Sequence, residues 1–265
     1  MSTVAVILGS AFERVSSKWQ AEYIKTPWGE QTFYRVPRPQ GTAYAILRHG
    51  SPHHFLPHQI PYRSMIWALG HLKCKALMST SSVGVLDAAL PLGQPMLLGD
   101  MLMLDNRLPD GHACTMFAQP TAEQGHLSCA QGLFSKALGQ QIKQLAAQVQ
   151  STLVEDIVFG YACGPRTKTP AENRMWSTFG AHVNSMSLGP EIVLANELEI
   201  PCAGLVIGHK YSLPTKTASG SSATDSLSIA ESLQHSRKGF MNLVEMFLQH
   251  ATAVPFENEI FRFNA

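Results

Sequence analysis

The strongest constraint on the fold is a recurring arrangement of short apolar runs, each followed by small polar residues, with helical segments between them. The clearest run, 76–86, begins Ala-Leu-Met and continues into four consecutive hydroxyl residues. Such a run predicts a buried strand that opens into a turn at 79–84. Hydroxyls and backbone N–H groups at this turn could bind an anion such as phosphate, or the hydroxyls could satisfy their own backbone.

The rest of the chain alternates in the same way between apolar runs and longer amphipathic segments. Strands are predicted at 3–10, 44–47, 95–104, 157–162, 183–187 and 202–207, with short strands and loops at 16–40. Helices are predicted at 61–72, 128–153, 170–180, 190–197 and 225–249. This alternation indicates an α/β fold. Because no internal repeat or domain boundary is evident, we expect a single domain over 1–265.

Composition narrows the class of protein. Hydrophobic residues make up 45% of the 265 residues and charged residues only 15%, which is typical of a compact globular protein with surface hidden in an oligomer. The net charge of +1 gives no reason to expect nucleic acid or a membrane surface as a partner, and no apolar run is as long as a membrane span. The five scattered cysteines, without a C-x-x-C pair, predict reduced thiols in a cytoplasmic protein.

Polar residues at strand ends are the candidate ligand-binding groups, because ligands of α/β sheets bind at strand ends. Ser10 follows the first strand, and Arg48 and His49 follow the strand at 44–47. A guanidinium at this place can contact phosphate or carboxylate, and the imidazole adds a donor. Four histidines between 49 and 58 also suggest a metal site. No carboxylate or cysteine completes a ligand set, and Pro52 breaks any helical face, so no metal is expected.

Two further segments carry local predictions. Thr169 can cap a helix that begins at Pro170, with Glu172 closing a capping box. The segment 212–226, rich in Ser, Thr, Gly and Ala, follows the last predicted strand. It is either a lid over a site or a disordered connector.

Short motifs at the predicted strand ends form an ordered set. They are Leu8-Gly9-Ser10, Arg48-His49-Gly50-Ser51-Pro52-His53, the run 62–69, Thr80-Ser81-Ser82-Val83-Gly84, Gly99-Asp100, Gly164-Pro165-Arg166 with Ala171-Glu172, and Met186-Ser187 with Pro190-Glu191. In this order the motifs resemble those of trimeric purine nucleoside phosphorylases and methylthioadenosine phosphorylases, over nearly the whole chain. The R-H-G-x-x-H pattern is closer to the methylthioadenosine branch.

The resemblance implies both a fold and a reaction. The fold is a twisted mixed β-sheet flanked by α-helices, usually in a homotrimer. In the reaction, inorganic phosphate attacks C1′ of a nucleoside and releases a base and a ribose 1-phosphate, with no cofactor. Because the transition state is oxocarbenium-like, a phosphate dianion under C1′ would stabilise the developing positive charge while it attacks. The expected partners are therefore a nucleoside and phosphate.

The resemblance also assigns roles to residues. Those at phosphate positions are Ser10, Arg48, His49, Ser81, Ser82 and Ser187. Met186 matches the residue under the ribose, and His126 resembles the histidine that a neighbouring subunit lends to the 5′ side. Residues that fall where the family lines the 5′-substituent pocket are Ile229, Ser232 and Leu233. The two apolar residues of that set would suit a methylthio group.

The chain departs from the family where the base should bind. A leaving purine accumulates negative charge at N7, and the family provides an Asp or Asn there, whereas this chain has Lys210 preceded by His209. After the G-P-R motif the family commonly has an aromatic residue and, in the nucleoside branch, a Glu. This chain has Thr167 and Lys168 instead. The segment 87–98 is also longer than the family's connection to Gly-Asp.

Three interpretations of this departure remain open. In the first, the protein is a purine nucleoside phosphorylase in which Lys210 or His209 neutralises the charge at N7. In the second, it is a phosphorylase for another aglycone, such as an anionic one that pairs with Lys168 and Lys210. In the third, it is a non-catalytic relative that binds nucleotide-like or phosphate ligands, or a structural subunit.

Overall fold

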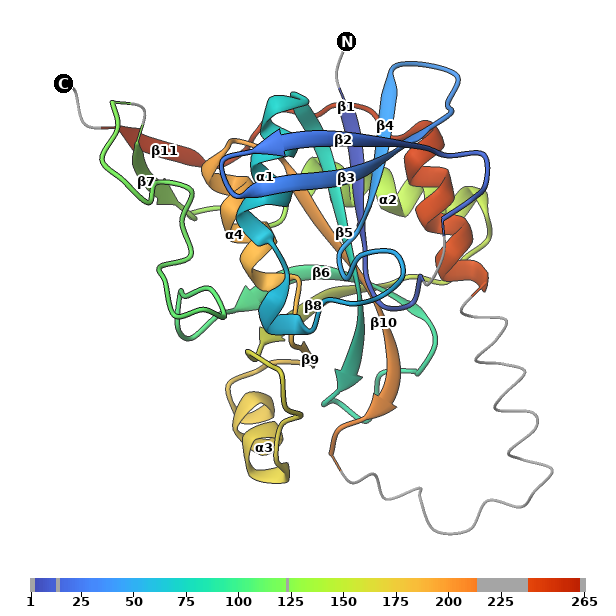
Figure 1. Ribbon diagram of the computed structural model, residues 1–265. Coiled ribbons are helices and arrows are strands. Elements are labelled where there is room, and N and C mark those ends of the chain that lie inside the picture. The colour runs from blue at the N-terminus through green and yellow to red at the C-terminus, as the bar shows by residue number, and fades with distance from the viewer. Residues whose placement is uncertain (1–2, 13–14, 123, 214–237, 263–265) are drawn as a thin grey trace.

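The computed structural model describes residues 3–12, 15–122, 124–213 and 238–262. Its central strand, β5 (Cys74–Val85), pairs in parallel with β1 (Thr3–Leu8) on one side and β10 (Cys202–Tyr211) on the other (Figure 1). All six residues of β1 are buried, as expected for a parallel strand covered on both faces.

Side chains of β1 alternate between two hydrophobic cores. Ala5 and Ile7 pack into one core, and Val4, Val6 and Leu8 pack into the other. This period of two follows from the pleat of the strand. It explains why a continuous apolar run is needed here.

Over the described residues, the main sheet is mixed and has nine strands in the order β10-β6-β8-β9-β5-β1-β4-β3-β2. An additional pairing joins β10 directly to β5, so part of the sheet closes on itself. The strands not yet given are β2 (Gln20–Thr26), β3 (Gly29–Val36), β4 (Thr42–Leu47), β6 (Pro95–Leu102), β8 (Val154–Tyr161) and β9 (Val183–Ser185). A separate antiparallel pair consists of β7 (Gly125–Ser128) and β11 (Glu259–Arg262).

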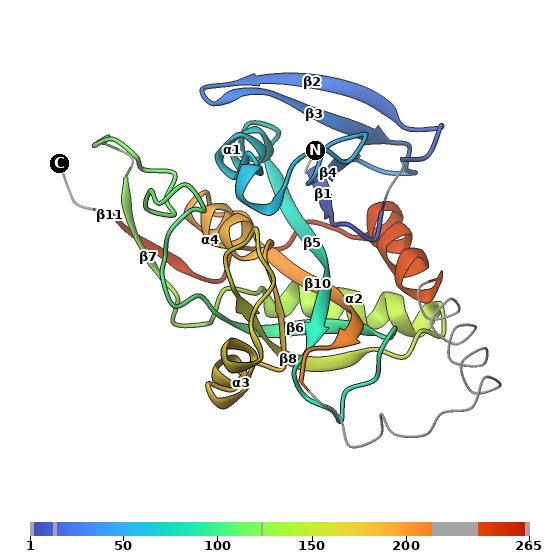
Figure 2. The ribbon, with the colours of Figure 1, turned by 60° about the horizontal axis from the view of Figure 1, so that its bottom comes forward.

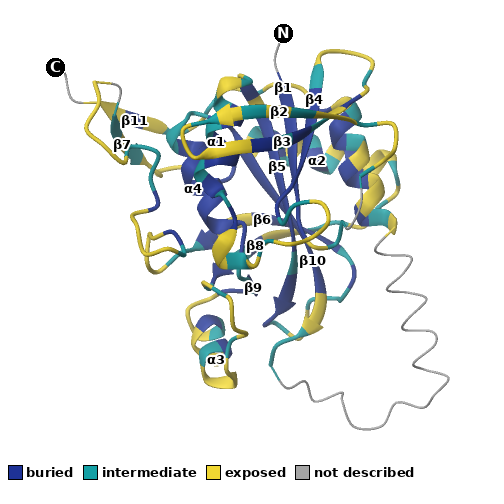
Figure 3. Cartoon of the chain, viewed as in Figure 1, coloured by how far each residue is buried: buried dark blue, intermediate teal, exposed yellow. Residues whose placement is uncertain are grey.

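Helices cover both faces of the central strands (Figure 2). One core contains residues of α1 (Tyr62–His71) and α4 (Gly189–Glu197), and the other contains residues of α2 (Lys136–Gln148) and of the helical segment 238–250. Helix α3 (Pro170–Thr178) lies at the end of the sheet where β5 and β10 terminate (Figure 1). A short 3-10 helix, η1 (Pro57–Gln59), precedes α1 in the chain. Burial is concentrated in the central strands and in α4, while β2 and β3 expose one side (Figure 3).

Most of the predicted elements are confirmed. The α/β class, the mixed sheet and the order of strands and helices agree with the structure. Thr169 caps α3, with Pro170 in the first turn and Glu172 closing the capping box. None of the helices in the described parts of the chain is long and apolar enough to cross a membrane. The single domain over 1–265 remains a prediction.

Three local predictions were wrong or lie beyond the described residues. No turn forms at 79–84, because these residues continue β5 and pair along their length with β10. The helix predicted at 128–153 is shorter, because Ser135 caps α2 and residues 125–128 form β7. The predicted lid at 212–226 and the start of the last predicted helix fall almost entirely within 214–237, outside the described residues.

Candidate active site

A cavity of about 490 Å³ lies where the ends of the central strands meet the loops after β8 and β9. It brings together most of the residues predicted from the sequence. Those that line it are Ser10, His49, Ser81, Ser82, Thr167, Lys168, Met186, Ser187, His209 and Lys210. Strand ends far apart in sequence therefore converge on one site, as α/β sheets generally allow.

The four consecutive hydroxyl residues of β5 have different roles: some make hydrogen bonds inside the protein and others line the cavity. Ser79 donates to Glu191, and Thr80 Oγ1 donates to the Ile7 carbonyl at 3.1 Å, so both hydroxyls are used inside the protein. Ser81 and Ser82 both line the cavity, but Ser81 Oγ also hydrogen-bonds to the Ser82 carbonyl and to Ser185 Oγ, each at 3.2 Å. The structural interpretation of the hydroxyls thus holds for the first three residues, and Ser82 is placed to contact a ligand.

The turn after β1 depends on a glycine. Gly9 N donates to Thr80 Oγ1 at 2.9 Å, which fixes the turn that carries Ser10 to the cavity. A Cβ at this position would lie 2.7 Å from the Thr80 carbonyl oxygen and 2.8 Å from Arg48 Nη1. No larger residue fits without a shift of the backbone or of the guanidinium.

Arg48 is not among the residues that line the cavity. Its side chain has no exposed surface, and Nε donates to Glu191 at 2.9 Å while Nη1 donates to the Thr80 carbonyl at 2.8 Å. Burial alone would lower the pKa of Arg48, but the Glu191 carboxylate outweighs it and the pKa lies above its ordinary value. Glu191 was not predicted as the partner of Arg48. Any contact of Arg48 with phosphate remains a prediction.

His49 lines the cavity as a neutral imidazole. Its Nδ1 lies 2.8 Å from the Phe55 carbonyl, which can only accept, so Nδ1 carries the proton and Nε2 is an acceptor. Burial lowers the pKa of His49 to about 4, and the neighbouring Arg48 and His53 act in the same direction. The rings of His49 and His53 stack with centroids 4.4 Å apart. No group of His, Cys, Asp or Glu suited to a metal ion occurs in the described portion of the chain.

The opposite end of the cavity is rich in nitrogen groups. The register of β10 against β5 shifts between Gly208 and Lys210, and such an irregularity lets the neighbouring His209 and Lys210 line the same cavity. Partial desolvation of the His209 ring, together with the nearby Lys210 charge, lowers its pKa, so the ring is neutral at pH 7. Lys210 is exposed at the mouth of the cavity.

Lys168 reaches this end from the loop before α3. Burial, followed by the charge of Lys210, lowers the pKa of Lys168 to about 8. Arg166 anchors the loop through a bidentate contact with Glu172, at 2.8 and 2.7 Å. Lys168 and Lys210, the two lysines at which the sequence departs from the family pattern, therefore line the same cavity.

Two asparagines complete this end of the cavity and were not predicted from the sequence. Asn184 in β9 has no exposed surface, and its Nδ2 donates to Asn173 Oδ1 at 3.0 Å. Within the described part of the chain, Asn184 Oδ1 has no hydrogen-bond partner. Asn173 Nδ2 donates to the Ser212 carbonyl at 3.0 Å. A lone Asn in a short strand gives no signal in the sequence, and only the pairing of β9 with β5 brings Asn184 to the site.

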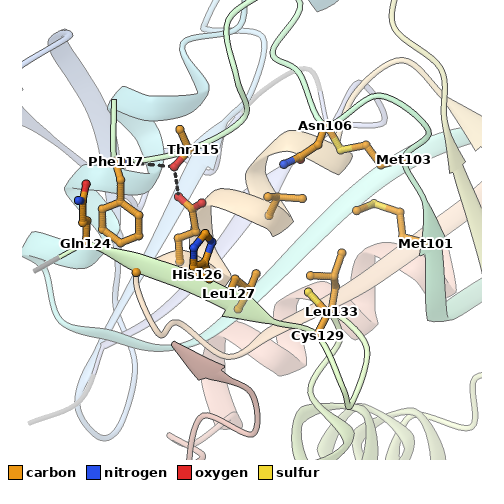
Figure 4. A pocket seen from close by; sticks show the side chains of 13 residues that line it. Met101, Met103, Asn106, Thr115, Phe117, Gln124, His126, Leu127, Cys129 and Leu133 are labelled. Atoms are coloured by element: carbon orange, nitrogen blue, oxygen red, sulfur yellow. Dashed lines mark hydrogen bonds between the residues drawn. The ribbon is translucent and has the colours of Figure 1, made fainter. Parts of the chain in front are cut away.

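The remaining predicted residues lie elsewhere. His126 is in β7 and lines a separate cavity of about 580 Å³ with Phe117, Gln124 and Glu197 among its other walls (Figure 4). It therefore does not reach the site of its own chain, and a contribution to a neighbouring subunit remains a prediction. Ile229, Ser232 and Leu233 lie outside the described residues.

Fold and site together define a class of protein. A mixed α/β sheet holds a cavity with hydroxyls at one end and cationic groups at the other, suited to an anion beside a polar organic ligand. A family model described as the phosphorylase superfamily matches residues 3–246. The chain therefore belongs to the phosphorylase superfamily.

Relatives within this superfamily act on nucleosides, as their names state. The chain is 30% identical over 212 residues to a probable S-methyl-5′-thioinosine phosphorylase of Methanopyrus kandleri, covering 80% of this chain and 79% of the relative. It is 27% identical over 263 residues to a 6-oxopurine nucleoside phosphorylase of Pyrococcus furiosus, covering 97% and 95%. The predicted family is confirmed.

A solved structure supports the fold. Methylthioadenosine phosphorylase from Schistosoma mansoni, in complex with adenine, aligns with a TM-score of 0.78 and covers 94% of this chain and 90% of its own. The two sequences are 21% identical. At that level of identity the similarity establishes the fold alone.

Proposed function

We propose that the protein is a nucleoside phosphorylase that acts on a purine nucleoside or a 5′-methylthio purine nucleoside, with inorganic phosphate as co-substrate and no cofactor. The observation that carries this proposal is the division of one cavity into a hydroxyl end and a cationic end. Ser81 and Gly84 are three strand residues apart, so the two ends are separated by ~10 Å, which leaves room for a ribose between phosphate and base.

Phosphate is proposed to bind at the hydroxyl end. Ser10, Ser82 and Ser187 are candidate donors, and the acceptor Nε2 of His49 suits the remaining proton of HPO₄²⁻. Arg48 is proposed to position these groups without touching the phosphate, because its hydrogen bonds to Thr80 and Glu191 hold the strand ends that carry them.

The proposed reaction joins a phosphate oxygen to C1′ as the bond from C1′ to N9 breaks. The electron pair of that bond remains on the base, and the proton lost by HPO₄²⁻ is balanced by one that the base takes up. A dianion close to C1′ stabilises the oxocarbenium-like transition state. Lys210 stabilises the negative charge that develops on the base, while neutral His209 can contribute a hydrogen bond but not a cationic charge. Met186 is proposed to lie under the ribose, and Thr167 beside the base.

The assembly and location are also proposals. A homotrimer would allow His126 of one subunit to approach the 5′ side of its neighbour's site, which agrees with its exposed position in β7. The low fraction of charged residues, 15%, is compatible with surface covered in such an oligomer. A role in purine salvage in the cytoplasm would fit this activity.

The test is phosphate-dependent release of base from methylthioadenosine, methylthioinosine, adenosine, inosine and guanosine, with the same reactions without phosphate as controls. The proposal predicts turnover of at least one nucleoside only when phosphate is present. If the protein binds nucleosides but turns over none of this panel or of any other nucleoside, it is a non-catalytic relative instead.

A further inference from the structure

The cationic end of the cavity contains no carboxylate among its described lining residues. Lys168 and Lys210 both line this end, and the charge of Lys210 contributes to the lowered pKa of Lys168. Neither lysine makes a hydrogen bond or an ion pair with any residue that the structure describes. Two ammonium groups in one cavity repel each other unless negative charge is bound between them.

The nearest acidic side chain does not neutralise this pair. Glu172 accepts two hydrogen bonds from Arg166, and its Oε2 also accepts from Thr169 N at 2.7 Å. These bonds hold the carboxylate in the capping box of α3 and lower the pKa of Glu172 to about 2. The positive charge at the cavity is therefore left for a ligand.

A buried acceptor lies beside the lysines. In the sheet, Gly84 pairs with Lys210 on one side and with Asn184 on the other. A Cβ at Gly84 would lie 3.3 Å from Asn184 Oδ1 and even closer to Ser212 Oγ, so both polar groups lie beside this glycine in the wall of the cavity. The Asn184 oxygen is buried and has no hydrogen-bond partner among the described residues, and leaving such a group unpaired is unfavourable. A ligand N–H would supply the missing partner.

We propose that this end of the cavity binds a nucleobase that is anionic at neutral pH and retains a ring N–H, with Lys168 and Lys210 pairing with its negative charge and Asn184 Oδ1 accepting from the N–H. The matching class is the 2,6-dioxopurines, whose nucleosides lose a ring proton near neutral pH and keep N1–H. A 6-aminopurine offers neither the charge nor a ring N–H. The inference rests on the proposed phosphorolysis and specifies its substrate class.

Three nucleosides separate the two recognition elements. Xanthosine offers charge and N1–H, inosine offers N1–H alone, and adenosine offers neither. With saturating phosphate at neutral pH, the expected order of kcat/KM is xanthosine, then inosine, then adenosine. The first step reflects a contact with a charged group and the second reflects the loss of the N–H that pairs with a buried acceptor, so each step should be roughly 10-fold.

Variants assign the preference to these residues. Lys168→Met and Lys210→Met should each lower kcat/KM for xanthosine about 10-fold more than for inosine. Asn184→Asp keeps an acceptor but adds a negative charge and loses the N–H that Asn173 Oδ1 accepts, so it should lower kcat/KM for both nucleosides and more strongly for xanthosine. Lys25→Met is the matched control, because Lys25 is exposed on β2, far from the cavity, and this variant should leave the order unchanged.

Equilibrium binding distinguishes this inference from the proposed reaction. In calorimetric titrations with phosphate present, xanthine should bind more tightly than hypoxanthine, and Lys168→Met should remove the difference. Phosphate-dependent turnover of inosine or adenosine without any preference for xanthosine or xanthine would overturn the inference and leave the proposed function intact. Preferential xanthine binding without turnover of any nucleoside would support the inference on the ligand and contradict the proposed reaction.

Discussion

Replacing Glu191 by alanine should destabilise the protein strongly. The Glu191 carboxylate has no exposed surface and accepts hydrogen bonds from Arg48 Nε at 2.9 Å, from Arg48 Nη2 and from Ser79 Oγ. The variant leaves the guanidinium charge buried without its partner. Loss of one member of a buried ion pair typically costs about 3–5 kcal/mol. In a chain of this size that corresponds to a fall in Tm of roughly 10 °C.

Urea unfolding followed by far-ultraviolet circular dichroism measures this loss. Glu199→Ala is the control, because the bridge between Glu199 and Arg262 spans 3.1 Å but leaves the two side chains 45% and 44% exposed. A surface pair of this kind contributes about 0–1 kcal/mol to the free energy of unfolding. The two variants remove the same chemical group, so the difference between them reports burial and pairing.

A double variant separates stability from function. Arg48→Met with Glu191→Leu removes both charges, so most of the lost stability should return. Its KM for phosphate should nevertheless stay raised, because the hydrogen bond from Arg48 to the Thr80 carbonyl is gone. If Glu191→Ala unfolds at the same urea concentration as Glu199→Ala, the reasoning on the buried pair is refuted.

Three other predictions follow from the site. Gly9→Ala should raise KM for phosphate at least about 10-fold, because its Cβ would lie 2.7 Å from the Thr80 carbonyl oxygen. Gly139→Ala is the control: its Cβ would lie 3.7 Å from its nearest neighbour, so KM for phosphate should stay unchanged. Ser82→Ala should weaken phosphate binding about 10- to 100-fold in a titration with phosphate, and equal affinity would remove Ser82 from the site. The pKa of Lys168 is lowered from 10.5 to about 8, so between these pH values the unfolded chain binds more protons than the folded one and Tm should rise with pH. Lys168→Met should reduce this rise. An unchanged pH profile of Tm in the variant would contradict the assigned shift.

Local features of the fold were predictable because they depend on short stretches of chain. The apolar run of β1 and the capping box of Thr169 and Glu172 are properties of neighbouring residues, and both are confirmed. The predicted turn at 79–84 failed because hydroxyl residues at the end of an apolar run also suit a central strand. The neighbouring strands pair with these residues and override the local signal.

The site was predictable to the extent that strand ends converge. Ser10, His49 and Ser187 meet in one cavity as expected, and the unusual lysines do face it. The partner of Arg48 could not be found in the same way, because Glu191 is 143 residues away in sequence. Asn184 was missed for a related reason, since only the register of β9 against β5 sets its position.

The most direct test of the account is the identity of the sugar product. Phosphorus NMR of the reaction with xanthosine or inosine should show a ribose 1-phosphate formed in equal amount to the free base, and no reaction without phosphate. Free ribose as the product, or base release that is independent of phosphate, would show that the hydroxyl end of the cavity does not deliver phosphate to C1′ and would contradict the central claim.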